Sequence, residues 1–145
     1  NHQNYRVYTV MGDGELAEGS VWEGAMSAAH YKLDNLCAVV DRNRLQISGN
    51  TEDVMHHDDL HERFRSFGWH VIDVKNGNSI EELDAAFEEA KTVKGKPTVL
   101  IANTVKGCGS SVMENKASWH HHVPGDEEYE QIMKDLEERK EAALK

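Results

Sequence analysis

The first residues able to do chemistry are an aspartate between two glycines and an asparagine further along the chain. Asp13 closely follows the run YRVYTVM (residues 5–11), and Asn43 closely follows the run NLCAVVD (35–41). A carboxylate oxygen and an amide oxygen are hard ligands, which suit Mg²⁺ or Ca²⁺. Each short motif taken alone fits an ordinary turn better than a binding site. The pair becomes a candidate site only if the fold brings the two side chains together.

Gly12 and Gly14 add a place for a phosphate group beside Asp13. Because glycine has no side chain, the backbone here can approach a bound phosphate closely, and the helix expected to follow offers its free N–H groups. Mg²⁺ takes about six oxygen ligands at ~2.1 Å and usually takes some of them from a bound phosphate. The two glycines, Asp13 and Asn43 together therefore predict a site for a metal-bridged diphosphate.

Strands and helices alternate along the chain. This alternation is what would bring Asp13 and Asn43 close together. The pattern predicts strands at 5–11, 35–41, 69–75 and 97–104, and helices at 15–32, at 57–68, after Ser79 and at 126–144. This order predicts an α/β fold with a parallel sheet and helices on both faces. Parallel strands end at one edge of the sheet, ~4.8 Å from their neighbours. Asp13 and Asn43 are therefore expected to meet at that edge.

Local signals describe three of these helices further. The helix expected at 15–32 has an apolar side formed by Leu16, Val21, Ala25, Ala28 and Ala29. Gly68 is expected to end the following helix at a C′ position. Ser79 is expected to cap the next one, with Glu82 in the capping-box position.

Two further groups of candidate ligands are better explained without a metal. His57 and His61 are four residues apart, but Asp58 follows His57 where the zinc pattern HExxH needs Glu. We expect both histidines on the solvated face of a helix. Cys37 and Cys108 form neither a zinc spacing nor a disulfide framework, so we expect reduced thiols.

Composition and charge exclude two classes of partner. The chain has 145 residues, of which 26 are acidic and 16 basic, and its net charge is −10. A nucleic-acid surface needs clustered Lys and Arg, so we expect no nucleic acid as partner. No run approaches the ~18 apolar residues of a membrane span, and no leader is evident, which predicts a cytoplasmic protein without membrane contact. The abrupt start NHQNYRVYTV suggests a fragment of a longer chain.

Longer stretches of the sequence are similar to a known family. GDGELAEGSVWEGAMSAAHYKLDNL (residues 12–36) resembles the thiamine diphosphate motif of transketolases, and the resemblance continues through LQISG, FGWHV, NGNSIEEL, GKPTVLIANTVKG and MENKASWH. It covers nearly the whole chain and is closest in style to bacterial two-subunit transketolases, whose N-terminal subunit carries this domain. It implies a thiamine-diphosphate-binding fold that is incomplete at the N-terminus. A dehydrogenase component or a deoxyxylulose-phosphate synthase fits less well.

The resemblance implies a cofactor site with assigned ligands. Asp13 and Asn43 match the side-chain ligands of Mg²⁺, for which Ca²⁺ can substitute, and Leu45 matches the residue whose backbone carbonyl binds the same ion. Gly12 matches a backbone contact to the diphosphate of thiamine diphosphate. Glu18 matches an acid between the two cofactor sites of a dimer; an ordinary first-turn glutamate, favoured by the helix dipole, is the alternative.

The resemblance also implies a catalytic histidine. His120, in SWHH, matches a histidine near the reactive carbon of the cofactor, where an imidazole can move a proton. The family usually has Gly and a basic or small residue where this chain has His121 and His122, so a one-position shift between His120 and His121 stays open. A triple-histidine metal site is the disfavoured alternative. Lys106 lies in a loop that folds over the cofactor in the family, and Cys108 in that loop is expected to be a bystander thiol.

The implied function is that of the diphosphate- and Mg-binding part of a transketolase. Such an enzyme moves a two-carbon ketol group from a ketose phosphate to an aldose phosphate. Residues 1–125 are expected to form part of that domain and 126–145 its C-terminal helix. Activity would need the missing N-terminal part and a C-terminal transketolase subunit or domain that binds the pyrimidine, in a homo-oligomer or heterotetramer. The alternatives are a non-catalytic assembly or regulatory subunit with the same fold, and a related enzyme for another ketose.

Overall fold

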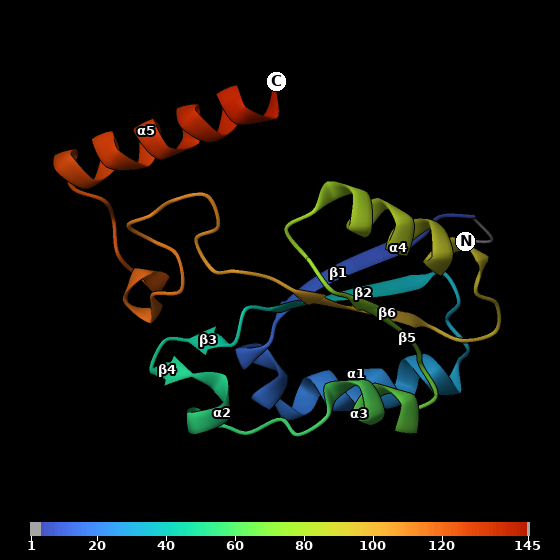
Figure 1. Cartoon of the computed structure of the whole chain (residues 1–145). Coiled ribbons are helices and arrows are strands. Elements are labelled where there is room, and N and C mark those ends of the chain that lie inside the picture. Colours follow the sequence, from blue (N-terminus) through green and yellow to red (C-terminus); the bar gives the residue numbers. More distant parts are fainter. Residues whose placement is uncertain (1–3, 145) are drawn as a thin grey trace.

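The computed structural model describes residues 4–144 and has a four-stranded parallel sheet at its centre (Figure 1). The strand order is β1-β2-β6-β5, with β1 at Val7–Gly12, β2 at Leu36–Arg42, β6 at Thr98–Asn103 and β5 at His70–Val74. All three pairings are parallel. The predicted fold class is therefore confirmed, and each strand lies within two residues of its expected range.

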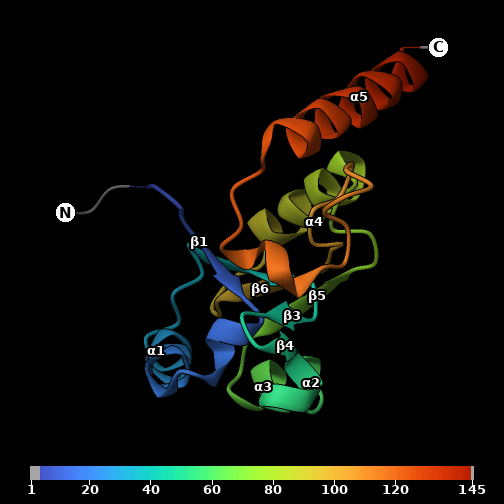
Figure 2. The ribbon, with the colours of Figure 1, turned by 90° about the vertical axis from the view of Figure 1, so that its left-hand side faces the viewer.

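Helices cover both faces of this sheet. α1 and α3 lie on one face and α4 on the other, while α5 lies further out on the side of α4 (Figures 1 and 2). The bounds of the helices, with η denoting 3₁₀ turns, are η1 Gly14–Ala17, α1 Gly19–His30, α2 Thr51–Val54, α3 Leu60–Ser66, α4 Ile80–Thr92, η2 Ala117–His120 and α5 Asp126–Ala143. A short antiparallel hairpin of β3 (Leu45–Gln46) and β4 (Gly49–Asn50) follows β2. No helix of residues 4–144 has both the length and the apolar character needed to cross a membrane.

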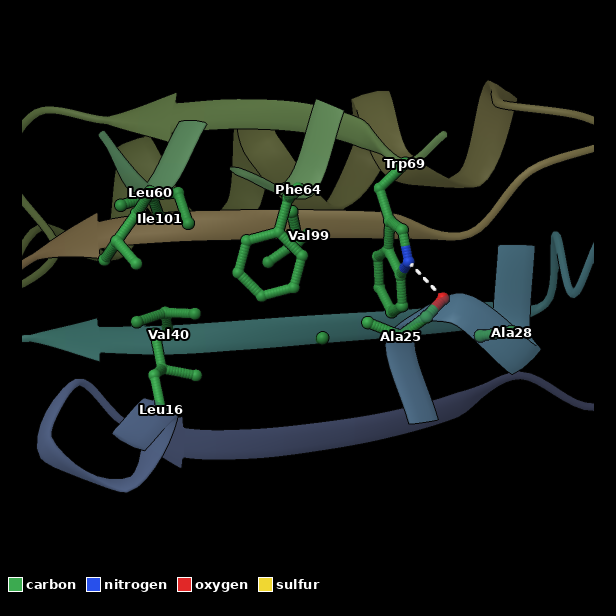
Figure 3. Packing of buried hydrophobic residues seen from close by; sticks show 10 residues of the cluster. Leu16, Ala25, Ala28, Val40, Leu60, Phe64, Trp69, Val99 and Ile101 are labelled. Atoms are coloured by element: carbon green, nitrogen blue, oxygen red, sulfur yellow. Dashed lines mark hydrogen bonds between the residues drawn. The ribbon is translucent and has the colours of Figure 1, made fainter. Parts of the chain in front are cut away.

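The core between α1, α3 and the sheet is built around aromatic rings. The rings of Phe64 and Trp69 lie 5.6 Å apart in a near-perpendicular arrangement, over Val99 of β6 (Figure 3). The Trp69 indole N–H donates to the carbonyl oxygen of Ala25 at 2.9 Å, which connects α1 to the residue just before β5. β2 and β6 are apolar along most of their length because both of their faces are covered.

The edge strand β1 is much more exposed than its neighbour β2. Val7, Tyr8 and Val10 are all exposed, Val10 to 71%. Parallel strands normally have both faces covered by other elements. The exposure of this strand identifies the flank of the sheet where residues 4–144 supply no cover.

Two local expectations need correction at the helix starts. The helix expected at 15–32 is divided, because Glu18 has an extended backbone (ψ 125°) that separates η1 from α1. Ser79 caps α4 as expected, accepting from the N–H of Glu82 at 3.3 Å, but the capping box is wrong. The Glu82 carboxylate accepts instead from the N–H of Asn76 at 2.9 Å, which the preceding turn brings within reach.

The expectation for His57 is also wrong. α3 begins only at Leu60, so His57 lies in the connection before it, and its side chain is buried, with 3% exposure. His61 does lie on α3, where its Nε2 contacts a carboxylate oxygen of Asp73 at 3.0 Å. The end of α3 is as predicted: Gly68 follows the C-cap Phe67 with φ +90°, a conformation that favours glycine.

The N-cap of α3 gives a test of the fold. The Asp59 carboxylate accepts from the backbone N–H groups of Glu62 at 3.1 Å and His61 at 2.9 Å, and these bonds hold its pKa below the ordinary 3.8. Replacing Asp59 by Ala should therefore lower the unfolding temperature at pH 7. Because folding lowers the pKa of Asp59, its ionised carboxylate stabilises the fold above pH 3.8. This contribution to stability is lost as the pH falls through the lowered pKa.

Thermal unfolding at pH 7 and near pH 3 measures this effect, with Glu130→Ala on exposed α5 as the matched control. The difference in unfolding temperature between the wild type and Asp59→Ala should become smaller at the lower pH. At pH 7, Glu130→Ala should differ from the wild type much less than Asp59→Ala does. An equal difference in unfolding temperature at both pH values would contradict the role of the Asp59 carboxylate as the N-cap of α3.

Candidate functional site

A cleft of ≈ 530 Å³ opens at the carboxyl edge of the sheet, where β1 and β2 end. The strand register places Gly12, the last residue of β1, beside Asp41 of β2, so the segments that follow the two strands start next to each other. Every residue assigned to the site from the sequence lines this one cleft: Gly12, Asp13, Gly14, Glu18, Asn43, Leu45 and His120.

Asp13 is the buried anchor of the cleft, with only 2% of its surface exposed. One carboxylate oxygen accepts from the N–H of Gly14 at 2.9 Å, and the other accepts from the N–H of Arg44 at 2.6 Å. Burial raises the pKa of Asp13, and the neighbouring carboxylate of Asp41 adds to this, while the two backbone hydrogen bonds oppose it. A cation bound at Asp13 would offset the cost of burying this charge.

Asn43 is fixed by its own loop at the end of β2. Its Oδ1 accepts from the N–H of Leu45 at 2.9 Å, and its Nδ2 donates to the carboxylate of Asp41 at 3.3 Å. The hydroxyl of Thr104 donates to that same carboxylate oxygen. Arg44 has φ +64°, which turns the chain sharply after Asn43. The loop therefore holds the amide at the edge of the cleft that Asp13 lines.

The donor set fits a hard divalent cation. It offers the carboxylate of Asp13, the amide oxygen of Asn43 and the backbone carbonyl of Leu45, all oxygen atoms of residues that line one cleft. Within residues 4–144 there is no group of three or more His, Cys, Asp or Glu that could hold a metal. Three protein oxygens leave about three positions of an octahedral ion for phosphate oxygens or water, as Mg²⁺ prefers.

Gly14 is required where the turn after β1 meets the β3–β4 hairpin. A Cβ atom on Gly14 would lie 2.9 Å from the Cβ of Gln46 and 3.0 Å from its Oε1, closer than real contacts normally allow. The Gly14→Ala variant should therefore displace the hairpin and lower the free energy of unfolding by about 1–3 kcal/mol, as overpacked sites do.

Chemical denaturation of Gly14→Ala and Gly24→Ala tests this contact. A Cβ on Gly24, inside α1, would meet nothing within 4 Å, so that variant should gain about 0.5–1 kcal/mol from helix propensity. Equal stability of the two variants would show that Gly14 is not confined by Gln46.

His120 reaches the cleft from the last turn of η2. Its ring is 4.7 Å from the ring of His121, edge to face, and His121 does not line the cleft. His122 turns away, with its ring 4.4 Å from Trp119 and its Nε2 2.7 Å from the carboxylate of Glu128. This placement favours His120 over His121 for the catalytic role, which stays a prediction.

Four lining residues were not identified from the sequence: Glu15, Gln46, Ile47 and Ser48. The last three belong to the hairpin region, and their signals are that they follow Asn43 and Leu45 and lie in the stretch LQISG, which resembles the family. The Glu15 carboxylate accepts from the N–H of Gly12 at 3.3 Å, so an acidic oxygen sits where a phosphate oxygen is expected to bind. Lys106, from the loop after β6, also lines the cleft and supplies a positive charge to it.

Comparison with known proteins identifies the class to which this fold and cleft belong. Residues 1–142 match the family described as "Transketolase, thiamine diphosphate binding domain". The chain belongs to this transketolase family, as the resemblance in its motifs predicts.

The relatives include separate subunits as well as whole enzymes. The chain is 47% identical over 136 residues to one subunit of the apulose-4-phosphate transketolase of Phocaeicola vulgatus, covering 94% of this chain and 48% of that one. It is 38% identical to 6-deoxy-6-sulfo-D-fructose transketolase subunit SqwG of a Clostridium species, covering 94% and 50%. The transketolase structure of Campylobacter jejuni superimposes with a TM-score of 0.85 at 29% identity, over 92% of this chain and 21% of that one. The chain thus spans about half the length of these relatives that are separate subunits.

Proposed function

We propose that this chain is the thiamine diphosphate- and Mg²⁺-binding part of a transketolase that moves a two-carbon ketol group from a ketose phosphate to an aldose phosphate. The observation that carries the proposal is the single cleft shared by Asp13, Asn43 and His120, three residues from separate segments of the chain. A non-catalytic subunit that only kept the fold would have no need of this set of side chains.

Each side chain has a role that follows from its position. Asp13, Asn43 and the carbonyl of Leu45 would hold the metal, and the turn of Gly12 and Gly14 would let the backbone approach the diphosphate. The cofactor, when bound, supplies the thiazolium carbon that attacks the ketose carbonyl. His120, exposed at the cleft mouth, would accept or donate a proton at a substrate hydroxyl.

A partner is part of the proposal. The apulose-4-phosphate transketolase relatives are about twice as long as this chain, and each is named as one lettered subunit, which implies a second. A C-terminal transketolase subunit or domain would supply the pyrimidine-binding part, in a homo-oligomer or heterotetramer. Glu18 lies at the rim of the cleft with an exposed side chain that makes no cap hydrogen bond, which suits a contact across that interface.

Calorimetric titration of thiamine diphosphate into the full-length protein with its partner subunit, with and without Mg²⁺, tests the proposal. We expect saturable binding that requires the metal, and ketol transfer by the reconstituted pair. Absence of metal-dependent binding in the complete complex would overturn the proposal. A screen of ketose donors, including apulose phosphate and sulfofructose types, would then define the substrate.

A further inference from the structure

Gln46 links the two segments that carry the proposed metal ligands. It is the last residue of β3, and its side chain crosses to the turn after β1, where its Cβ and Oε1 lie close against Gly14. Its Oε1 is fully buried and accepts no hydrogen bond from residues 4–144. Its Nε2 makes no hydrogen bond with residues 4–144 either, but it is not among the fully buried atoms, so on a residue that lines the cleft it is available as a donor.

Three of the backbone N–H groups around this point are already engaged. The N–H of Gly12 donates to Glu15, and the N–H groups of Gly14 and Arg44 both donate to Asp13. An anion that binds beside the turn would therefore gain from a side-chain donor. The Nε2 of Gln46 is such a donor, and it is held in place by a side chain packed between two fixed segments.

We propose that Gln46 is a further cofactor-contacting residue, whose amide N–H donates to a diphosphate oxygen of bound thiamine diphosphate. The inference rests on the proposed function and adds a residue to its binding site. It gives a role to the amide N–H of a side chain that lies at the junction of Gly14 and the hairpin. Hydrogen bonds to charged groups contribute more than neutral ones, so the loss of this one should be measurable.

The charge of the cleft explains why the amide suits this position. Asp13, Glu15 and Glu18 already line it, so a glutamate at position 46 would place a fourth acid beside the diphosphate. Leucine is apolar and somewhat shorter than glutamine, and it cannot donate a hydrogen bond. We therefore expect Gln46→Leu to weaken thiamine diphosphate binding about tenfold, the effect of one hydrogen bond to a charged group, and Gln46→Glu to weaken it further.

The test is calorimetric titration of two probes, each with saturating Mg²⁺, into the full-length protein with its partner subunit. The probes are thiamine diphosphate and inorganic pyrophosphate, which share only the diphosphate group. Gln131→Leu and Gln131→Glu, on α5 outside the cleft, are the matched controls and should bind both probes as the wild type does. Thermal unfolding of each variant with its partner establishes that it is folded; if Gln46→Leu does not fold, Gln46→Glu carries the test.

Each outcome supports or overturns the contact. The contact is supported if the Gln46 variants bind both probes more weakly by a similar factor and the Gln131 controls bind them as the wild type does. If the wild type binds both probes and the Gln46 variants bind them equally well, the role of Gln46 is overturned and the proposed function stays intact. A loss for thiamine diphosphate with unchanged pyrophosphate binding would overturn the assignment to the diphosphate. No binding by the wild type would overturn the proposed function and this inference with it.

Discussion

Replacing Asp13 by Asn is expected to weaken Mg²⁺-dependent binding of thiamine diphosphate at least about 100-fold, since even residues that only support a ligand cost 10–100-fold when changed. The substitution removes the one negative charge among the three proposed metal ligands. It also turns an amide NH₂ toward the N–H of Gly14 or of Arg44, both of which now donate to this carboxylate. Titration of the cofactor into the complete complex measures the loss.

The control separates this effect from loss of the fold. Because burial raises the pKa of Asp13, its protonated form favours the fold at low pH, and this contribution is lost as pH rises through the raised value. At pH 7 the neutral side chain of the Asp13→Asn variant avoids burying a charge but leaves one buried N–H without an acceptor, so the free energy of unfolding should fall by about 1–3 kcal/mol. Asp73→Asn, on β5 outside the cleft, should bind the cofactor normally. Cofactor binding by Asp13→Asn equal to that of the wild type would remove Asp13 from the metal site.

Replacing His120 by Asn is expected to lower the rate of ketol transfer about 10²–10⁴-fold, the usual contribution of a positioned general acid–base group. Cofactor affinity should change little, because His120 lines the mouth of the cleft and is not among the proposed metal ligands. Steady-state kinetics of the reconstituted enzyme, together with the cofactor dissociation constant, distinguish the two effects.

His121→Asn is the matched control for His120, since the two rings are in contact and only His120 lines the cleft. We expect the His121 variant to keep most of the wild-type rate. A large loss in His121→Asn with a small loss in His120→Asn would move the catalytic role by one position along the chain.

The sheet and its site edge were predictable because both depend on signals that are local in the sequence. β2 and β6 are short apolar runs, which only strands covered on both faces need. Once the strands are parallel, Asp13 and Asn43 must follow neighbouring ends at one edge. Their shared cleft therefore follows from the strand order and needs no detail of side-chain packing.

The features that were not predicted depend on contacts between distant segments. The β3–β4 hairpin has two residues in each strand, too few to give a periodic pattern. Its position depends on the left-handed conformation of Arg44, a residue type that gives no signal for it. The division of the helix at Glu18 and the burial of His57 likewise arise from packing. The same is true of Gln46, whose proposed role depends on its contact with Gly14.

A crystal structure of the full-length protein with its partner, thiamine diphosphate and Mn²⁺ in place of Mg²⁺ would test the central claim most directly. The anomalous signal of Mn²⁺ locates the ion without ambiguity. We predict one ion bound at ~2.1 Å by the Asp13 carboxylate, the Asn43 amide oxygen, the Leu45 carbonyl and oxygens of the diphosphate. An ion held elsewhere, or a diphosphate bound away from the turn at Gly12–Gly14, would contradict the account.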